Sequence, residues 1–350
     1  MGGLPNFSKL LRKIERENDI YRVGSDEFAI ALTQVSDIKK YTKNLYIKLI
    51  DNRIFLKELE IAIEGLDLKI GMAMNMDNLF QSATFALKEV KRRNEKIYKA
   101  TKKDITRKNE AIKQAMNWSK IIRKALEEDK FEPFYQPIVD EYGRVIKYEV
   151  LMRLNYKNRY ILPSSFLKIA KKNLQYISIS KSLFLKINKN ISVSFNISLL
   201  DIENEEMRTF LLNKIKNLKT NVAFTLEILE SERVKDFNMV KSFIDKLRSY
   251  GVKIAIDDFG SGYSNFSRVI ELAPEILKID GSLIRDINID SNKQKIVKSI
   301  VLFAKEVNIQ IVAEYVENEQ IFNICKSLGV DYYQGFYFSK PKSIQKIINS

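Results

Sequence analysis

The chain has 350 residues and a formal net charge of +15, with 45% hydrophobic and 29% charged residues. This length suits two domains, and the composition is that of an ordinary globular protein rather than a disordered or collagen-like one. The sequence has no histidine and a single cysteine, Cys325, which excludes histidine-based nucleophilic catalysis, zinc sites built on His or Cys, and a disulfide framework.

The charge and hydropathy patterns limit the partners that we expect. No apolar run approaches the ~18–20 residues that a bilayer span needs, and residues 1–13 lack the pattern of a secretory signal. The basic residues form no block of five or more like charges, which favours a lysine-rich solvated surface over a nucleic-acid groove. We therefore expect a cytoplasmic location, no nucleic-acid partner and no membrane segment in this chain.

The first part of the chain reads as a small mixed α and β region. Apolar spacing predicts helices over residues 7–17 and Leu79–Tyr98, a hairpin over Asp19–Leu32, and a strand over Leu66–Met74. The basic, polar stretch Lys91–Lys108 ends this region. A connecting helix is predicted at about Ala111–Glu128.

From Phe131 onward, short apolar strands alternate with amphipathic helices such as Met239–Tyr250 and Lys293–Val307. This alternation predicts a mostly parallel sheet, and eight strands in this length suit a TIM-like (β/α)8 barrel. The short turn Asp140–Gly143 predicts that the first two strands form a hairpin, so that one strand is antiparallel. The predicted strands are Phe131–Val139, Val145–Leu154, Ile191–Ile197, Val222–Ile228, Val252–Asp257, Ile276–Asp280, Ile309–Ala313 and Tyr332–Phe338.

Polar residues fall in or at the carboxyl ends of seven of these strands. In a barrel those ends meet on one face, which is where enzymes of this architecture keep their active sites. A single Asp after a strand is more often a helix cap, but a whole series of such positions is hard to explain as caps. The residues are Glu149, Asn196, Glu227, Asp257 with Asp258, Lys278, Glu314 and Gln334.

The residue types in this series favour a site for hard cations. Carboxylate and amide oxygens suit Mg²⁺ or Mn²⁺, and the adjacent Asp257 and Asp258 are placed to serve two ions. Two such ions stabilise both the attacking and the leaving oxygen when a phosphodiester is hydrolysed. Lys278 is then expected to orient or deprotonate water, or to neutralise phosphate charge. An N-cap remains the alternative for Asp258 alone.

Seven motifs in order carry a family resemblance that covers essentially all of residues 115–345. They are FYQPIVDEYGRVIKYEVLMRL, FNIS, LEILES, IAIDDFGSGYSNFSRV, LKIDGSLI, VAEYVE and YYQGFYFSKP. This series resembles the EAL family of cyclic di-GMP phosphodiesterases. The resemblance implies a barrel that converts cyclic di-GMP to linear 5′-pGpG with two Mg²⁺ or Mn²⁺ ions, and that Ca²⁺ inhibits.

The resemblance also implies roles for individual residues. Glu149, Lys278, Glu314 and Asp258 would be catalytic, with Lys278 and Glu314 governing the nucleophilic water. Glu230 would steady the loop Phe259–Ser267, which in this family couples dimerisation to metal binding, so a homodimer through the barrel is expected. The implied metal ligands are Glu149, Asn196, Glu227, Asp257 and Asp258, and the implied substrate contacts are Gln136, Arg153 and Gln334.

Two positions depart from the family pattern. Val150 stands where the signature has Ala, which is a small apolar change. Tyr315 stands where the family usually has Gly between Ala-Glu and Val-Glu. If that position requires a positive φ or a close backbone approach, Tyr would be costly there and could tilt Glu314.

The first region resembles the second half of a GGDEF diguanylate cyclase. The resemblance rests on YRVGSDEF at Tyr21–Phe28, with Ser25 in place of the second Gly, and on LKIGMAM and SATFALKEVKRRNEK. The strand that supplies that family's metal-binding Asp is missing, so no cyclase site can be completed. Arg16–Asp19 is similar to that family's inhibitory motif, but its spacing to Gly24 is one residue short.

These patterns predict a partial GGDEF-like domain over residues 1–108, a connecting helix over 109–128 and a barrel over 129–350. The abrupt start suggests that the chain is a piece of a longer protein. The favoured function is hydrolysis of cyclic di-GMP, because every metal ligand of the motif series is present. A cyclic di-GMP receptor that binds without cutting is the alternative. A bifunctional cyclase and hydrolase fails on the missing half-domain.

Overall fold

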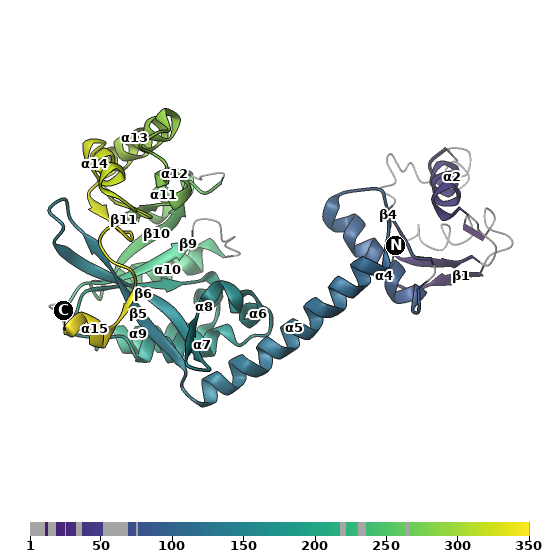
Figure 1. The fold of residues 1–350 in the computed structure, drawn as a ribbon, viewed down its shortest axis with the longest axis horizontal. Helices are drawn as coiled ribbons and strands as arrows, with labels where there is room; N and C mark the ends of the chain where they lie inside the picture. The colour runs from purple at the N-terminus through teal and green to yellow at the C-terminus, as the bar shows by residue number, and fades with distance from the viewer. Residues whose placement is uncertain are drawn as a thin grey trace. The chain divides into compact units, whose positions relative to one another are not determined.

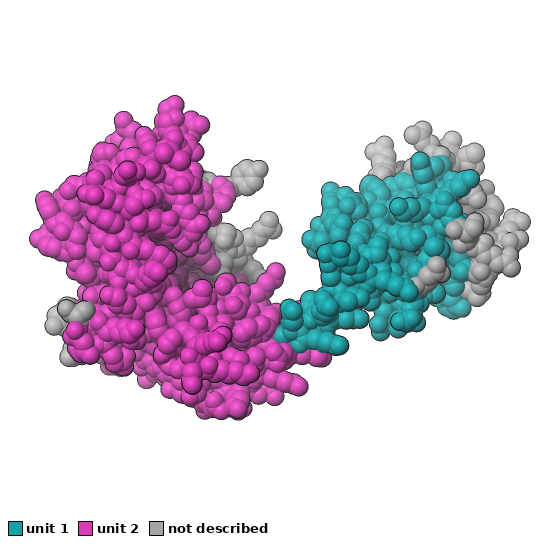
Figure 2. Space-filling model, in the orientation of Figure 1, with its two compact units in different colours: residues 1–114 teal, residues 115–350 magenta. Residues whose placement is uncertain are grey.

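The computed structural model describes residues 11–12, 19–24, 26–32, 37–51, 69–74, 76–217, 222–229, 236–262 and 266–349 (Figure 1). Its contacts divide the chain into two compact units, Met1–Gln114 and Ala115–Ser350 (Figure 2). Within the described residues, no helix combines the length and the apolar character that crossing a membrane requires.

The described residues of the first unit form two small two-stranded sheets. The strands β1 and β2 pair in antiparallel fashion, which confirms the hairpin, and β3 pairs with β4 in parallel. Apart from residues 11–12, the predicted helix over 7–17 lies outside the described residues. The elements are β1 (Asp19–Arg22), β2 (Phe28–Ala31), α2 (Ile38–Asp51), β3 (Ile70–Met72), α4 (Leu79–Arg93), β4 (Ile97–Lys99) and the start of α5 (Lys102–Glu127).

The predicted helix over Leu79–Tyr98 is wrong at its C-terminal end. The helix α4 ends at Arg93 because Asn94 adopts a left-handed conformation, with φ 55°, and its N–H is donated to the carbonyl of Val90. The following residues turn back and form β4. A second boundary also differs, since α5 begins at Lys102, within the basic stretch Lys91–Lys108 and before the predicted start at about Ala111.

The second unit is an eight-stranded α/β barrel. It contains β5 (Phe131–Val139), β6 (Val145–Tyr156), β7 (Arg159–Ile161), the 3₁₀ turn η1 (Pro163–Ser165), α6 (Leu167–Lys172), α7 (Tyr176–Leu185), β8 (Val193–Ile197), α8 (Leu199–Glu203), α9 (Glu205–Ile215), β9 (Phe224–Leu229), α10 (Phe237–Arg248), β10 (Lys253–Phe259), α11 (Phe266–Leu272), β11 (Ile276–Ile279), α12 (Gly281–Ile284), α13 (Ser291–Glu306), β12 (Gln310–Ala313), α14 (Glu319–Ser327), β13 (Tyr332–Tyr333), β14 (Lys342–Ser343) and α15 (Ile344–Ile348).

The barrel closes in the order β5-β6-β8-β9-β10-β11-β12-β13 and returns to β5. The strand β5 is antiparallel to both of its barrel neighbours, and the other neighbouring pairs are parallel. This arrangement confirms the predicted barrel with one antiparallel strand. The last predicted strand, Tyr332–Phe338, is shorter than expected and ends at Tyr333, where the chain turns across the barrel end. The short edge strands β7 and β14 were not predicted.

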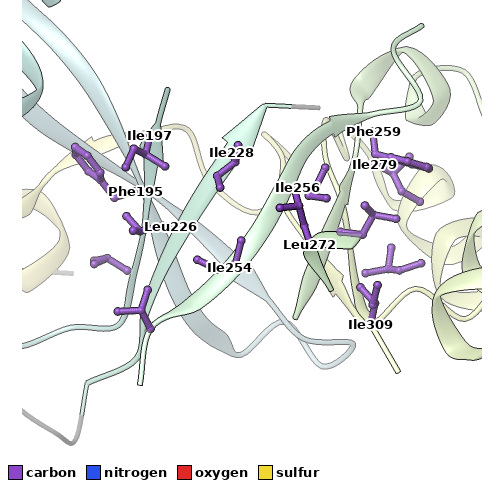
Figure 3. Close-up of a cluster of buried hydrophobic side chains, with 14 of the residues drawn as sticks. Phe195, Ile197, Leu226, Ile228, Ile254, Ile256, Phe259, Leu272, Ile279 and Ile309 are labelled. Carbon is purple, nitrogen blue, oxygen red and sulfur yellow. The ribbon is translucent and has the colours of Figure 1, made fainter. Parts of the chain in front are cut away.

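Side chains that alternate along the strands build the core on the outer face of the barrel. Phe195, Leu226, Ile254 and Ile256 are all buried there, between the strands and the surrounding helices (Figure 3). Because successive side chains of a strand point to opposite faces, their neighbours in sequence line the barrel interior. The hydrophobic pattern therefore determines which residues face inward.

The inward-facing residues form two layers. The layer toward the amino ends of the strands includes a small apolar cluster of Ile138, Ala255, Ile276 and Val312. The layer toward the carboxyl ends consists of the polar residues that the sequence singles out. Apolar packing outside the barrel, together with this apolar cluster below, thus holds a polar group of side chains at one end of the barrel.

Candidate active site

Lys278 is the centre of the polar layer. Its side chain is 1% exposed, and its ammonium nitrogen forms ion pairs with four carboxylates from four different strands or strand ends. The distances from Nζ are 2.7 Å to Glu227 Oε2, 2.8 Å to Glu314 Oε1, 3.0 Å to Asp257 Oδ1 and 3.3 Å to Glu149 Oε2. The structure therefore brings these five predicted site residues together.

Glu149 links this cluster to three predicted amides. Asn196 Nδ2 donates to Glu149 Oε1 at 2.7 Å, and Gln334 Nε2 donates to Glu149 Oε2 at 2.6 Å. The same Gln334 nitrogen lies 3.2 Å from Gln136 Oε1, while Gln136 Nε2 donates to the carbonyl of Ser339. These bonds hold the Glu149 carboxylate in one orientation.

The mutual pairing sets the charges of the two best-connected groups. Burial lowers the pKa of Lys278, but the surrounding carboxylates, led by Asp257 and Glu149, outweigh burial and raise the pKa well above its usual value. Burial raises the pKa of Glu149, but Lys278, Gln334 and Asn196 together bring it below the usual value. Without a metal ion, Lys278 is an ammonium cation and Glu149 a carboxylate.

The remaining carboxyl groups are harder to ionise. Burial raises the pKa of Glu227 to about 7 despite the opposing effect of Lys278. Burial also raises the pKa values of Asp257 and Glu314, in both cases against the effect of Lys278. The pKa of Asp258 rises to about 6 through burial and the neighbouring charge of Asp257. The cluster has more acidic groups than one ammonium can neutralise.

This surplus of oxygen ligands fits a divalent cation. Oxygen atoms of Asp257, Asp258 and Glu314 all lie within 4.8 Å of one another. Glu227 Oε1 is buried and has no hydrogen-bond partner among the described residues. Carboxylate oxygens without sulfur or imidazole ligands match hard cations such as Mg²⁺ and Mn²⁺. Sequence reasoning gave Glu314 a role at the water, and its position also makes it a candidate ligand.

Asp258 lies inside β10, several residues before α11, so the N-cap alternative for this residue is wrong. Its φ is 57°, a conformation that non-glycine residues adopt rarely. The register of β10 against β11 also shifts between Ile256 and Phe259. This irregularity interrupts the alternation, so that Asp257 and Asp258 both offer oxygen atoms to the same group.

Arg153 forms its contacts beside the central cluster. The Arg153 guanidinium donates to the carbonyl of Met152 at 2.8 Å and lies 5.6 Å from the ring centroid of Phe134. Burial lowers the pKa of Arg153, and Glu149 opposes this shift, which places Arg153 within electrostatic reach of the cluster. Glu230 lies outside the described residues, as do residues 263–265 of the predicted coupling loop.

Sequence reasoning missed Lys147, a buried cation beneath the cluster. Its side chain lies on the same face of β6 as Glu149, is 6% exposed and donates to Thr225 Oγ1 at 3.3 Å. Burial lowers its pKa to about 8, against the opposing effect of Glu227. Its position two residues before Glu149 in an alternating strand was the available signal.

Tyr315 adopts φ 54°, so this position does require the left-handed region that favours glycine. Its neighbour Glu314 nevertheless reaches Lys278 at 2.8 Å. The tyrosine therefore does not displace Glu314 from the cluster.

The chain is similar to known proteins over the barrel. The EAL domain family model matches residues 119–341. The cyclic di-GMP phosphodiesterase PdeA of Borreliella burgdorferi is 31% identical over 97% of this chain and 51% of its own length. The cyclic di-GMP phosphodiesterase PdeF of Escherichia coli K12 is 34% identical over 65% of this chain and 32% of its own length.

Among solved structures, the EAL enzyme Bd1971 in its cAMP and cyclic di-GMP bound form has a TM-score of 0.64 at 25% identity, covering 76% of this chain and 73% of that chain. This chain spans about half the length of PdeA and about a third of PdeF. The family match covers more than half of the chain and includes the entire polar cluster. The chain belongs to the EAL domain family.

Proposed function

We propose that the barrel hydrolyses cyclic di-GMP to linear 5′-pGpG. The observation that carries this proposal is the group of Asp257, Asp258 and Glu314 oxygens within 4.8 Å at the carboxyl end of the barrel. Curated relatives named cyclic di-GMP phosphodiesterases support the choice of substrate. A solved EAL enzyme with bound cyclic di-GMP supports it as well.

The carboxylates would hold Mg²⁺ or Mn²⁺ at two adjacent positions. The ligands would be Glu149, Asn196, Glu227, Asp257 and Asp258, with Glu314 alongside. When bound, the ions supply Lewis-acid stabilisation of the attacking and leaving oxygens of the phosphodiester. The surplus of carboxyl groups over ammonium groups in the buried cluster would favour cation binding, and its oxygen-only ligands would favour hard cations.

The chain's own residues would orient the substrate and the attacking water. Lys278, held as an ammonium by its carboxylate partners, would neutralise charge that develops on the phosphate. Glu314, with its raised pKa, is suited to accept a proton from water. Gln136, Arg153 and Gln334 would contact the nucleotide.

The direct test is to incubate the purified chain with cyclic di-GMP and Mg²⁺ or Mn²⁺ and to separate the products by chromatography. We expect linear 5′-pGpG, with loss of turnover in EDTA and in Ca²⁺. Tight binding of cyclic di-GMP by calorimetry without any linear product would instead identify a receptor. The observation that favours a receptor is the strained backbone of Tyr315 beside Glu314.

We infer further that two barrels form a homodimer through α11 and the end of α13. Phe266 and Ile270 on α11 are 41% and 61% exposed, and Val307 after α13 is 40% exposed. The rings of Phe266 and Phe303 are 4.8 Å apart, so the two helices share this apolar surface. Ile270 and Val307 also line a cavity of about 410 Å³. A second copy would cover these side chains.

We also propose that the first unit is a remnant of a GGDEF-like domain with a connecting helix after it. The hairpin at Tyr21–Phe28 supports this proposal, since Glu27 O accepts from both Val23 and Gly24. The Glu27 carboxylate pairs with Lys91 at 2.9 Å. Because the sequence lacks the strand that would carry the cyclase's metal-binding Asp, incubation with GTP and Mg²⁺ should yield no cyclic di-GMP.

A further inference from the structure

Tyr315 occupies a strained backbone position that is fixed from both sides. The N–H of Glu314 donates to the carbonyl of Ile279 at 3.2 Å, and the N–H of Val316 donates to the carbonyl of Gln334 at 3.0 Å. The residues before and after Tyr315 are therefore tied to the ends of β11 and β13. Tyr315 makes the turn between them with φ 54°, where a side chain normally costs stability.

The Tyr315 ring lies between Gly281, the first residue of the short helix α12, and Arg285, the residue that follows this helix. A Cβ atom placed on Gly281 would overlap Cδ2 and Cγ of the ring, so the ring rests directly on the glycine backbone. The guanidinium carbon of Arg285 lies 4.2 Å from the ring centroid, within the range of a cation–π contact. Arg285 is itself fixed to α12, because its N–H donates to the carbonyl of Gly281 at 2.8 Å.

These contacts connect two strand ends that carry site residues. The helix α12 follows β11, which carries Lys278, and Tyr315 follows Glu314 at the end of β12. Lys278 and Glu314 pair at 2.8 Å. A ring held against α12 therefore restrains the backbone from which the Glu314 side chain projects.

We propose that Tyr315 is a positioning residue: its ring, held by Gly281 and Arg285, fixes the left-handed turn that directs Glu314 toward Lys278 and Asp257. The tyrosine thus replaces the conformational freedom of a glycine with a contact that selects one conformation. The effect on catalysis rests on the proposed phosphodiesterase function, whereas the effect on cation binding does not. Glu314 belongs to the oxygen group that fits a cation, so its orientation affects both.

Leu174 provides a matched control for backbone strain. It has φ 58° and is 86% exposed in the connection between α6 and α7. Leu174→Gly relieves the same kind of strain as Tyr315→Gly at a position away from the site. Both glycine variants have the freedom to adopt a positive φ, and they differ in whether a ring next to Glu314 is lost.

The test compares Tyr315→Phe, Tyr315→Gly, Tyr315→Ala, Gly281→Ala, the double variant Gly281→Ala/Tyr315→Ala, and Leu174→Gly. Each protein is assayed for kcat and KM with cyclic di-GMP and Mn²⁺, and for Mn²⁺ affinity by calorimetry without nucleotide. Circular dichroism and melting temperature establish that each variant is folded. A variant that does not fold is replaced in the comparison by Arg285→Ala, which removes only the outer contact.

We expect Tyr315→Phe and Leu174→Gly to match the unmodified chain. Tyr315→Ala should lower kcat by roughly 10- to 100-fold with KM nearly unchanged, because a small misplacement of a catalytic group is costly. Its Mn²⁺ affinity should fall as well, and Tyr315→Gly should be intermediate. Gly281→Ala should resemble Tyr315→Ala. The double variant should have no lower kcat or Mn²⁺ affinity than either single variant, because the two changes remove the same contact.

The proposal is overturned if Tyr315→Ala leaves both kcat and the Mn²⁺ affinity unchanged. A raised KM with unchanged kcat would also overturn it, because that pattern would make Tyr315 a substrate contact. If no protein hydrolyses cyclic di-GMP, the proposed function fails, and the Mn²⁺ titrations still decide the role of the ring. A loss of Mn²⁺ affinity in Tyr315→Ala that is absent in Tyr315→Phe would then support the positioning role of the ring.

Discussion

A single buried ammonium group, Lys278, is shared among four carboxylates at 2.7–3.3 Å. Burying charges is costly unless they are paired, and here the acids outnumber the ammonium group that pairs with them. Part of this imbalance is relieved by protonation, as the pKa of Glu227 near 7 indicates. Binding divalent cations would relieve the rest, which makes affinity for metal a consequence of how the cluster is buried.

Lys147 leads to a prediction about stability and pH. Burial lowers its pKa from 10.5 to about 8, so below pH 8 the folded protein holds a charge that the unfolded chain solvates better. Between pH 8 and pH 10.5 the unfolded state binds more protons at this lysine than the folded state does. The contribution of Lys147 to the free energy of unfolding therefore becomes more favourable as pH rises through this range. Lys147→Met should raise the free energy of unfolding in EDTA at pH 7 by on the order of 1–3 kcal/mol.

The measurement is urea unfolding of both proteins at several pH values. The advantage of the methionine variant should shrink as pH rises above 8, because the native lysine then loses its proton. A methionine variant that is less stable at pH 7 would show that the buried charge is favourable where it lies. Lys120→Met, at an exposed position on α5, is the control and should change little.

The sequence was informative about residues whose chemistry is visible in the strand pattern. Glu149, Asn196 and Glu227 could be placed in one site because their strands end on one face. The Tyr315 contacts could not be predicted, since Gly281 and Arg285 are about thirty residues away in the chain and meet the ring only in the folded barrel. Asp258 was ambiguous because its positive φ depends on a register shift in β10.

At the scale of elements, the short helix α8 begins with a buried capping box. Asp201 Oδ2 accepts from the N–H of Ser198 at 2.9 Å and from its hydroxyl at 3.1 Å. Burial raises the pKa of Asp201 to about 6, against the opposing effect of those hydrogen bonds. The folded state therefore binds a proton more readily than the unfolded state between pH 3.8 and 6, and this contribution to stability is lost as pH rises through 6.

Asp201→Asn should remove this dependence while keeping an oxygen that accepts from Ser198. We expect the free energy of unfolding of the variant, relative to the unmodified chain, to increase between pH 4 and pH 7 by on the order of 1–3 kcal/mol. Asp236→Asn changes the exposed cap of α10 and serves as the control. A constant difference across this range would mean that the Asp201 carboxyl titrates normally.

The barrel strands were predictable because their alternation is imposed by an apolar outer face and a polar inner end. The ends of elements that stop at a single turn could not be predicted. The helix α4 ends before the left-handed Asn94. The strand β13 has only two residues, and after it the carbonyl of Gln334 accepts from the N–H of Val316, while the N–H of Tyr337 donates to the carbonyl of Val316. The strands β7 and β14 are too short to show any periodicity.

The apolar surface formed by Phe266, Ile270, Phe303 and Val307 predicts that the chain associates as a dimer. Ile270→Asp should convert a dimer into a monomer, because it places a charge in the apolar interface. Light scattering at tens of micromolar protein with Mn²⁺ and cyclic di-GMP measures this directly. Leu174→Asp, at a more exposed leucine elsewhere on the barrel, should remain dimeric. A monomeric unmodified chain, or a dimeric Ile270→Asp variant, would refute this interface.

The proposed hydrolysis of cyclic di-GMP by the buried carboxylate cluster is tested with the variant Asp257→Asn. Asp257 pairs with Lys278 and shares the cation-sized oxygen group with Asp258 and Glu314, so the change removes charge where the ions would meet. In Mn²⁺, we expect the unmodified chain to produce 5′-pGpG and the variant to do so at a rate at least ~10³-fold lower, with a smaller loss of nucleotide affinity by calorimetry. Equal rates in the two proteins, or no linear product from the unmodified chain in either Mg²⁺ or Mn²⁺, would contradict it.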